Sequence, residues 1–141
     1  MNKHPDPRRV ARLISRAQNA LADELDVKLV PFDITAAQYV VLSTLHSGRA
    51  NIAAQICKEL SYSPGAMTRM LNRLEQKGMV RKAPSIGNRR TVQLELTEEG
   101  QRLFPSLLQA SGTVIDQYFG TFSAQELDTF EALLLKMFAG K

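Results

Sequence analysis

The N-terminal part of the chain has apolar residues at the spacing of a helix. The pattern follows Asp6 and Pro7, where the aspartate caps a helix and the proline occupies the first helical position without losing a hydrogen bond. These features predict a helix over residues 7–29 that Pro31 ends. The apolar positions of this helix are Val10, Leu13, Ile14, Ala17, Leu21 and Leu25.

Two further helices are predicted at the C-terminal end. Thr97, followed by two glutamates, caps a long helix, and Pro105 within it predicts a kink because proline removes one backbone hydrogen bond. A capping box over residues 123–126 starts the last helix. Its apolar face consists of Leu127, Phe130, Leu134, Met137 and Phe138.

The middle of the chain predicts three shorter helices. A capping box over residues 35–38 starts a buried helix that ends near residues 46–48. Asn51 is predicted to cap a short helix that ends before a turn at residues 61–62. The Ser63-Pro64 pair starts the next helix, and Gly78 ends it in a left-handed conformation.

A hairpin is predicted directly after these helices. Residues 80–83 form a strand candidate, and residues 91–96 alternate, with Val92, Leu94 and Leu96 on one face. The loop between them has a basic tip. A helix-turn-helix followed by a hairpin predicts a winged helix-turn-helix, so the fold class is mainly α with a small β-hairpin wing.

The apolar stripes of the long terminal helices exceed what one small winged lobe could cover. This excess predicts a homodimer in which the terminal helices meet a second copy. The alternative is a monomer that folds these three helices onto itself as a bundle.

Positive charge is concentrated in the middle of the chain. The net charge is +4, but residues 58–90 contain eight basic and two acidic residues, and the rest of the chain is therefore negative. Such clustering is what binding to nucleic-acid phosphates requires, whereas a solvated mixed surface would scatter its charges.

The predicted fourth helix has the composition of a helix that enters the major groove of DNA. Small residues at its start allow close approach, Arg69 reaches a guanine or a phosphate, and Arg73 holds the backbone. The basic loop would insert Arg89 or Arg90 into the minor groove. The predicted DNA contacts are Ser63, Pro64, Gly65, Ala66, Thr68, Arg69, Arg73, Asn88, Arg89 and Arg90.

Five segments in this order resemble the MarR (multiple antibiotic resistance regulator) transcription regulators. They are residues 34–42, 60–69, 73–80, 88–90 and 96–100. The resemblance implies a winged lobe at residues 34–97, and a dimerisation domain built from residues 1–33 and 98–141. It also implies a homodimer that reads a pseudo-palindromic operator in double-stranded DNA. Asn88 stands where the family usually has an aspartate, and Ser61 where a glycine is common.

The resemblance further implies a repressor that a small phenolic or carboxylate effector releases. The candidate effector contacts are Arg12 and Arg16 on the first helix and Tyr39 and His46 on the second. An arginine would neutralise a carboxylate. The ordinary alternatives are exposed ion pairs for the arginines, a core position for Tyr39, and a helix-capping role for His46.

The inventory of reactive residues argues against an enzyme. With two histidines, one cysteine and no glycine-rich phosphate loop, no catalytic grouping is suggested, and no cofactor or metal site is expected. Cys57 is predicted to be a buried, inert thiol rather than a redox sensor. No apolar run reaches the roughly 20 residues that cross a bilayer, so a cytoplasmic location is expected.

Two hypotheses about function remain from the sequence. The first is a dimeric, sequence-specific transcription regulator that responds to an effector. The second is an architectural DNA-binding protein with little sequence preference and no effector. A specific regulator should prefer its site over random DNA by roughly a thousandfold or more.

Overall fold

The computed structural model describes residues 4–84 and 92–141. In chain order the elements are α1 (Pro7–Leu29), the 3₁₀ helix η1 (Val30–Phe32), α2 (Ala36–Ser47), α3 (Ala53–Leu60), α4 (Pro64–Gln76), β1 (Val80–Pro84), β2 (Val92–Leu96), α5 (Glu98–Phe119) and α6 (Ala124–Lys136). The predicted fold class, mainly helical with a small hairpin, is therefore confirmed.

Side-chain caps start the helices where the sequence predicts them. The Asp6 carboxylate accepts a hydrogen bond from the backbone N–H of Arg8, and the Ser63 hydroxyl accepts one from Ala66. Both predicted capping boxes, at the starts of α2 and α6, form with their two reciprocal hydrogen bonds. Gly78 adopts the predicted left-handed conformation after α4, with φ of 76°. The helix α5 is continuous through Pro105, and the kink there stays a prediction.

The start of α3 differs from the prediction that Asn51 caps it. Ile52 occupies the N-cap position, and no side chain caps the helix. The carbonyl of Asn51 instead accepts a hydrogen bond of 2.7 Å from the backbone N–H of Leu94, and Ile52 pairs with Gln93 as an isolated β-bridge. Residues 51 and 52 are therefore bound to the edge strand β2, so the helix begins only at Ala53.

The strands β1 and β2 form an antiparallel hairpin. Val80 pairs with Leu96 at the end next to the helices, and Pro84 pairs with Val92 at the far end. Of the three residues predicted to share one face of β2, Leu94 and Leu96 are buried and Val92 is exposed. Val92 lies too far along the hairpin to reach the core. The predicted loop at residues 85–91 lies outside the described residues.

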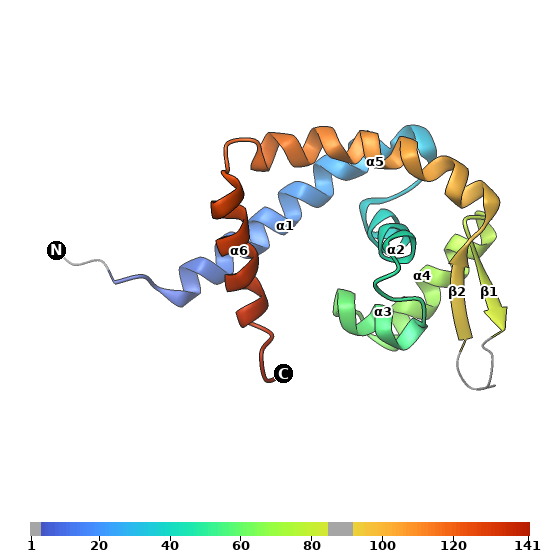
Figure 1. Ribbon diagram of the computed structural model, residues 1–141, viewed down its shortest axis with the longest axis horizontal. Helices are drawn as coiled ribbons and strands as arrows, with labels where there is room; N and C mark the ends of the chain where they lie inside the picture. The colour runs from blue at the N-terminus through green and yellow to red at the C-terminus, as the bar shows by residue number, and fades with distance from the viewer. Residues whose placement is uncertain (1–3, 85–91) are drawn as a thin grey trace.

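One hydrophobic core joins the winged lobe to the two long helices. Its fully buried side chains come from five helices and are Leu29, Val41, Leu42, Ile56, Met67, Leu74, Leu107 and Val114. Figure 1 shows α1 and α5 side by side, with α2, α3, α4 and the hairpin gathered at one end of the pair. The core therefore fixes the lobe to the C-terminal end of α1 and the N-terminal part of α5.

A polar contact also links α1 to α5. Tyr118 of α5 lies close to the carboxylate of Glu24 on α1. Desolvation raises the pKa of the Tyr118 hydroxyl above its ordinary value, and the nearby acceptor and negative charge of Glu24 raise this pKa further.

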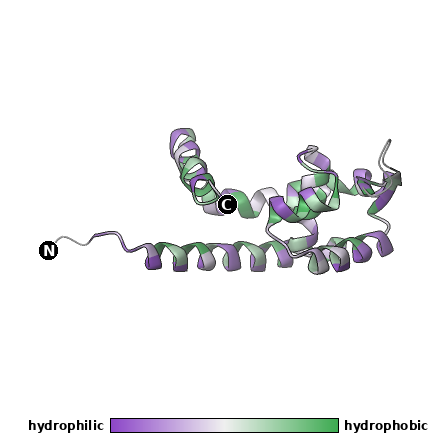
Figure 2. Ribbon diagram, turned by 90° about the horizontal axis from the view of Figure 1, so that it is seen from below, coloured by the Kyte–Doolittle hydropathy of each residue, from purple (hydrophilic) through white to green (hydrophobic). Residues whose placement is uncertain are grey.

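The helix α6 and the N-terminal half of α1 contribute almost nothing to this core. No residue of α6 is buried: Leu133 is 60% exposed, and Phe138, two residues after the end of the helix, is 61% exposed. Val10 on α1 is 51% exposed. Figure 2 shows hydrophobic and hydrophilic residues alternating along both helices, as in helices with one apolar face. One chain alone leaves these faces in water. Within the described part of the chain, no helix is long and apolar enough to cross a membrane.

Candidate nucleic-acid interface

The helix α4 presents one buried face and one exposed face. Met67, Leu71 and Leu74 are buried in the core, which fixes the rotation of the helix about its axis. Ser63, Pro64, Gly65, Thr68, Arg69 and Arg73 are exposed, and Ala66 is half-buried. The structure thus brings together the seven residues predicted for this helix, from its start to its third turn.

The side chain of Arg69 folds back over Gly65 toward the start of the helix. A Cβ atom at Gly65 would lie 3.6 Å from Nη1 of Arg69, an ordinary van der Waals distance, so the guanidinium lies beside this glycine. Helical side chains point toward the N-terminus, and recognition helices contact bases through their N-terminal residues. Arg69 therefore places a cation near the N-terminal end of α4, the end that would face base edges.

The hydroxyl of Thr68 is partly occupied within the helix. It donates a hydrogen bond of 2.9 Å to the carbonyl of Pro64. A hydrogen bond donated by this hydroxyl to a base would break that bond. The methyl group and the remaining lone pair of Thr68 stay available at the exposed surface.

The basic residues of the lobe fall into two groups. Arg81 is paired with Glu95 across the hairpin at 2.6 Å, and Lys82 lies 3.4 Å from a carboxylate oxygen of Glu75. Lys77 is bound to Asp33. A cation that is paired within the protein binds a phosphate less favourably, because its ion pair must first break.

The second group consists of cations without such partners. Lys58, Arg69 and Arg73 form no ion pair with any residue in ranges 4–84 and 92–141. Two of the three lie on the exposed face of α4. The predicted wing contacts Asn88, Arg89 and Arg90 lie outside the described residues.

The predicted effector contacts do not form one site within the chain. Tyr39 and His46, two turns apart on α2, both stack on Phe104 of α5, at centroid distances of 6.1 Å and 4.0 Å. The Tyr39 hydroxyl is also hydrogen-bonded to Ser111 at 2.8 Å. Arg12 and Arg16 are exposed on α1 and line neither the hollow beside Tyr39 nor the hollow beside His46.

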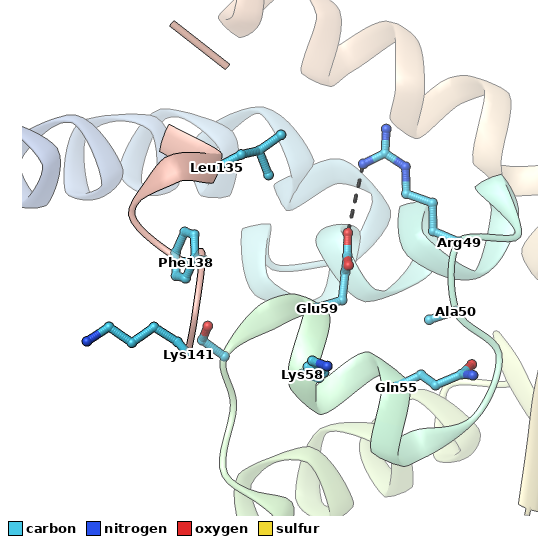
Figure 3. A pocket seen from close by; sticks show the side chains of 9 residues that line it. Arg49, Ala50, Gln55, Lys58, Glu59, Leu135, Phe138 and Lys141 are labelled. Carbon is cyan, nitrogen blue, oxygen red and sulfur yellow. Dashed lines mark ion pairs between the residues drawn. The ribbon is translucent and has the colours of Figure 1, made fainter. Parts of the chain in front are cut away.

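A larger hollow, which the sequence reasoning missed, lies between α3 and the end of α6. It has a volume of about 630 Å³. Figure 3 shows Leu135 and Phe138 on one side of it and Lys58 on the other, with Arg49 paired to Glu59 at 4.0 Å. Its lining combines apolar side chains with cations contributed by segments far apart in the sequence. Only the packing of α6 relative to the lobe brings them together.

Reactive side chains do not gather elsewhere in the described part of the chain. Cys57 is half-buried on α3 and forms no disulfide. Among residues 4–84 and 92–141, no group of three or more histidine, cysteine or carboxylate side chains could hold a metal ion.

Comparison with known proteins identifies the family. The MarR family pattern matches residues 34–92. The multiple antibiotic resistance protein MarR of Escherichia coli (strain K12) is 33% identical over 130 residues, which cover 92% of this chain and 88% of that protein. The HTH-type transcriptional regulator PecS of Dickeya dadantii (strain 3937) is 30% identical over 140 residues, covering 94% and 84%.

The solved structures agree with the sequence comparison. A mutant MarR from E. coli complexed with operator DNA has a TM-score of 0.77 at 33% identity, covering 91% of this chain and 92% of that chain. A MarR transcriptional regulator from Methanosarcina mazei Go1 shares the fold, with a TM-score of 0.79 at 20% identity. With a winged lobe, two long scaffold helices and relatives that match over nearly the whole chain, this protein belongs to the MarR family.

Proposed function

We propose that this protein is a transcription regulator that binds a specific operator in double-stranded DNA. The observation that carries the proposal is the exposed face of α4, where small residues surround an arginine that has no ion-pair partner among the described residues. The MarR structure in complex with operator DNA supports it, because that chain has the same fold at 33% identity. A regulator of this kind is a binding protein rather than an enzyme.

Selection of bound fragments from random DNA, followed by competition binding, tests this function. A specific regulator prefers the selected site over random duplex by roughly a thousandfold or more. If random DNA displaced the protein equally well from every fragment, the protein would be an architectural DNA-binding protein, and the proposal would be wrong.

Two arginines of α4 test the assigned roles. Arg69→Ala should lower both affinity and sequence preference, because Arg69 lies at the end that faces base edges. Arg73→Ala, one turn further along, should weaken binding to all sequences and flatten the salt dependence. Equal losses with unchanged selectivity would contradict the assignment.

The wing makes a separate contribution in this proposal. Arg90 occupies the arginine position of the family's wing pattern, and Arg89 and Asn88 precede it. Arg90→Ala should therefore lower operator affinity more than Arg89→Ala does. The domain division follows the same scheme, with the DNA-binding lobe at residues 34–97 and the dimerisation domain at residues 1–33 and 98–141.

The functional unit in this proposal is a homodimer. The uncovered apolar faces of α1 and α6 support it, because exposed apolar surface of this extent marks an interface. Size-exclusion chromatography with light scattering should give twice the 15.7 kDa mass of one chain. A 15.7 kDa particle at micromolar concentration would indicate the alternative, a monomer.

Release by a small aromatic or phenolic carboxylate completes the proposal, with the protein acting as a repressor. The hollow between α3 and α6 supports this part, because it lies between the lobe and a predicted dimerisation helix and has the volume of a small-molecule site. Apolar side chains would contact a ring, and Lys58 would attract a carboxylate.

A thermal-shift screen of small aromatic acids tests this part. A binding acid should raise the melting temperature of the parent protein and of His46→Ala, but raise that of Lys58→Ala less. If His46→Ala alone lost the response, the effector would bind beside Phe104 instead.

A further inference from the structure

The side chain of Lys77 spans two parts of the fold that are far apart in sequence. Lys77 is the C-cap residue of α4, and its ammonium group donates hydrogen bonds to the backbone carbonyl of Asp33 and to Oε1 of Gln38, the latter at 2.9 Å. It also lies 3.8 Å from the Asp33 carboxylate. The side chain is 23% exposed, so most of it is withdrawn from solvent.

The acceptors of Lys77 lie at the junction of α1 with α2. Asp33 follows η1 in a left-handed conformation, with φ of 56°. Gln38 is buried, and its Oε1 also accepts the capping hydrogen bond from the backbone N–H of Thr35. Asp26 of α1 accepts a hydrogen bond of 2.6 Å from the N–H of Ala36. These contacts connect α1, the start of α2 and the end of α4 through polar groups.

The same end of α4 is held by α5 on another side. The hydroxyl of Thr97, the N-cap residue of α5, donates a hydrogen bond to the carbonyl of Gly78. The backbone N–H of Thr97 donates one of 3.0 Å to the carbonyl of Met79. The C-terminal end of α4 is thus fixed between the ends of the two long scaffold helices.

We infer that Lys77 is a positioning residue that sets the orientation of the DNA-binding helix relative to the dimerisation scaffold. Its donors are directed toward the α1–α2 junction, so Lys77 differs from Arg73, which is exposed on the same helix. Lys77 is one of the eight basic residues within residues 58–90, whose charge favours binding to phosphates. Its hydrogen bonds inside the fold, however, direct its ammonium group away from DNA. The inference rests on the proposed function, a dimer that contacts two half-sites.

Orientation matters because the second lobe of a dimer binds DNA intramolecularly. Once one lobe is bound, the effective concentration of the other at its half-site depends on how rigidly both are held at the correct spacing. Loosening the lobe on its scaffold lowers that effective concentration without changing any contact to DNA. The affinity for an isolated half-site should therefore be unaffected.

The test compares Lys77→Met with the parent on a full operator and on a duplex that carries one half-site. Methionine keeps much of the side-chain volume and removes the three donors. We expect the full operator to lose affinity by roughly fivefold or more, the loss arising from effective concentration, with an unchanged half-site affinity. The salt slope should also stay unchanged. Arg73→Ala is the matched control: it should weaken both duplexes and reduce the slope by about 0.9 for each phosphate that the protein no longer neutralises.

A second measurement requires no DNA. Gln55 is exposed on α3, and a spin label at Gln55→Cys in a Cys57→Ser background reports the distance between the two lobes of a dimer. Lys77→Met should broaden the distance distribution obtained by pulsed electron paramagnetic resonance. Gln38→Glu, which keeps an acceptor for the ammonium and the capping box, should leave the distribution narrow.

Thermal unfolding establishes that the variants are folded at the assay temperature. Should Lys77→Met fail to fold, Gln38→Met removes one acceptor from the same ammonium and is expected to broaden the distribution as well. Equal losses on both duplexes with a reduced salt slope would make Lys77 a phosphate contact and overturn the inference. Parent-like binding and a parent-like distribution would overturn it too. Failure of the parent itself to prefer any two-half-site operator would instead refute the proposed function.

Discussion

The contact between α5 and the hairpin leaves no space for a side chain at Gly100. This glycine lies in the first turn of α5, and a Cβ atom there would be 2.4 Å from the carbonyl oxygen of Met79 and 3.3 Å from its carbonyl carbon. The Met79 carbonyl cannot easily move away, because it accepts the 3.0 Å hydrogen bond from the backbone N–H of Thr97. Gly100→Ala should therefore displace the helix from the hairpin.

The magnitude follows from two opposing effects. Alanine favours a helix over glycine by up to about 1 kcal/mol. Overpacking against a rigid neighbour costs about 1–3 kcal/mol, and the contact with a hydrogen-bonded backbone carbonyl places Gly100 toward the upper end. We expect a net loss of about 1–2 kcal/mol in the free energy of unfolding.

The same helix offers a matched control at Gly112. Among the described residues, a Cβ atom there meets nothing within 4 Å outside its own stretch of helix, so Gly112→Ala should gain about 0.5–1 kcal/mol from helix propensity. The difference between the two variants then isolates the contact with Met79. It should amount to about 1.5–3 kcal/mol, or several degrees in melting temperature for a chain of this length.

The assay is chemical or thermal unfolding of parent and both variants at one protein concentration, because the stability of a dimer depends on concentration. Equal shifts for the two glycines would refute the reasoning. A stabilised Gly100→Ala protein would show that α5 and the hairpin are free to move apart.

Three further predictions follow from other positions. Ser61 has a positive φ of 55° at the end of α3, so Ser61→Gly should stabilise the protein by about 0.5–1 kcal/mol in urea unfolding, whereas Ser106→Gly, within α5, should destabilise it by about 0.5 kcal/mol. The raised pKa of Tyr118 favours the neutral hydroxyl in the folded state, so its stabilising effect is complete below pH 10 and is lost as the pH rises through the folded pKa. Tyr118→Phe should therefore lose less stability than the parent between pH 9 and pH 11, and an identical alkaline loss would contradict this. Phe130→Asp, at a position 43% exposed on α6, should shift the mass from dimer to monomer in light scattering while the circular dichroism spectrum stays helical.

The starts of the helices were predictable because the interactions that fix them are local. The caps of α1, α2, α4 and α6 each join residues two or three positions apart, so the residue types and their order contain the information. The start of α3 was not predictable in this way. It depends on the hydrogen bond between Leu94 and Asn51, which lie 43 positions apart. The residues near Asn51 contain no signal that a distant strand will pair with them.

The same difference between local and long-range interactions decides which parts of the candidate site could be predicted from the sequence. The exposed face of α4 followed from the helical period, because Met67, Leu71 and Leu74 had to be buried. Arg69 and Gly65 are at positions i+4 and i of one helix, so their proximity follows directly from the predicted helix. The hollow between α3 and α6 has no local signal, since it depends on how α6 is placed relative to the lobe.

Ion pairing within the lobe changes how its net charge should be interpreted. Residues 58–90 contain eight basic residues, but Lys77, Arg81 and Lys82 are paired with acidic residues of the chain. The five others in this region are Lys58, Arg69, Arg73, Arg89 and Arg90. A count of charge from sequence therefore overstates the number of cations that can replace counterions on DNA.

The salt dependence of binding measures that number. Each phosphate contact contributes about −0.9 to the slope of log K against log salt. A dimer using all eight basic residues of each lobe would give a slope of about −14, whereas five in each lobe give about −9 at most. We expect a slope no steeper than about −9 on a full operator between 50 and 200 mM salt. A slope approaching −14 would show that DNA breaks the internal pairs of Lys77, Arg81 and Lys82, and that the hairpin changes its contacts on binding.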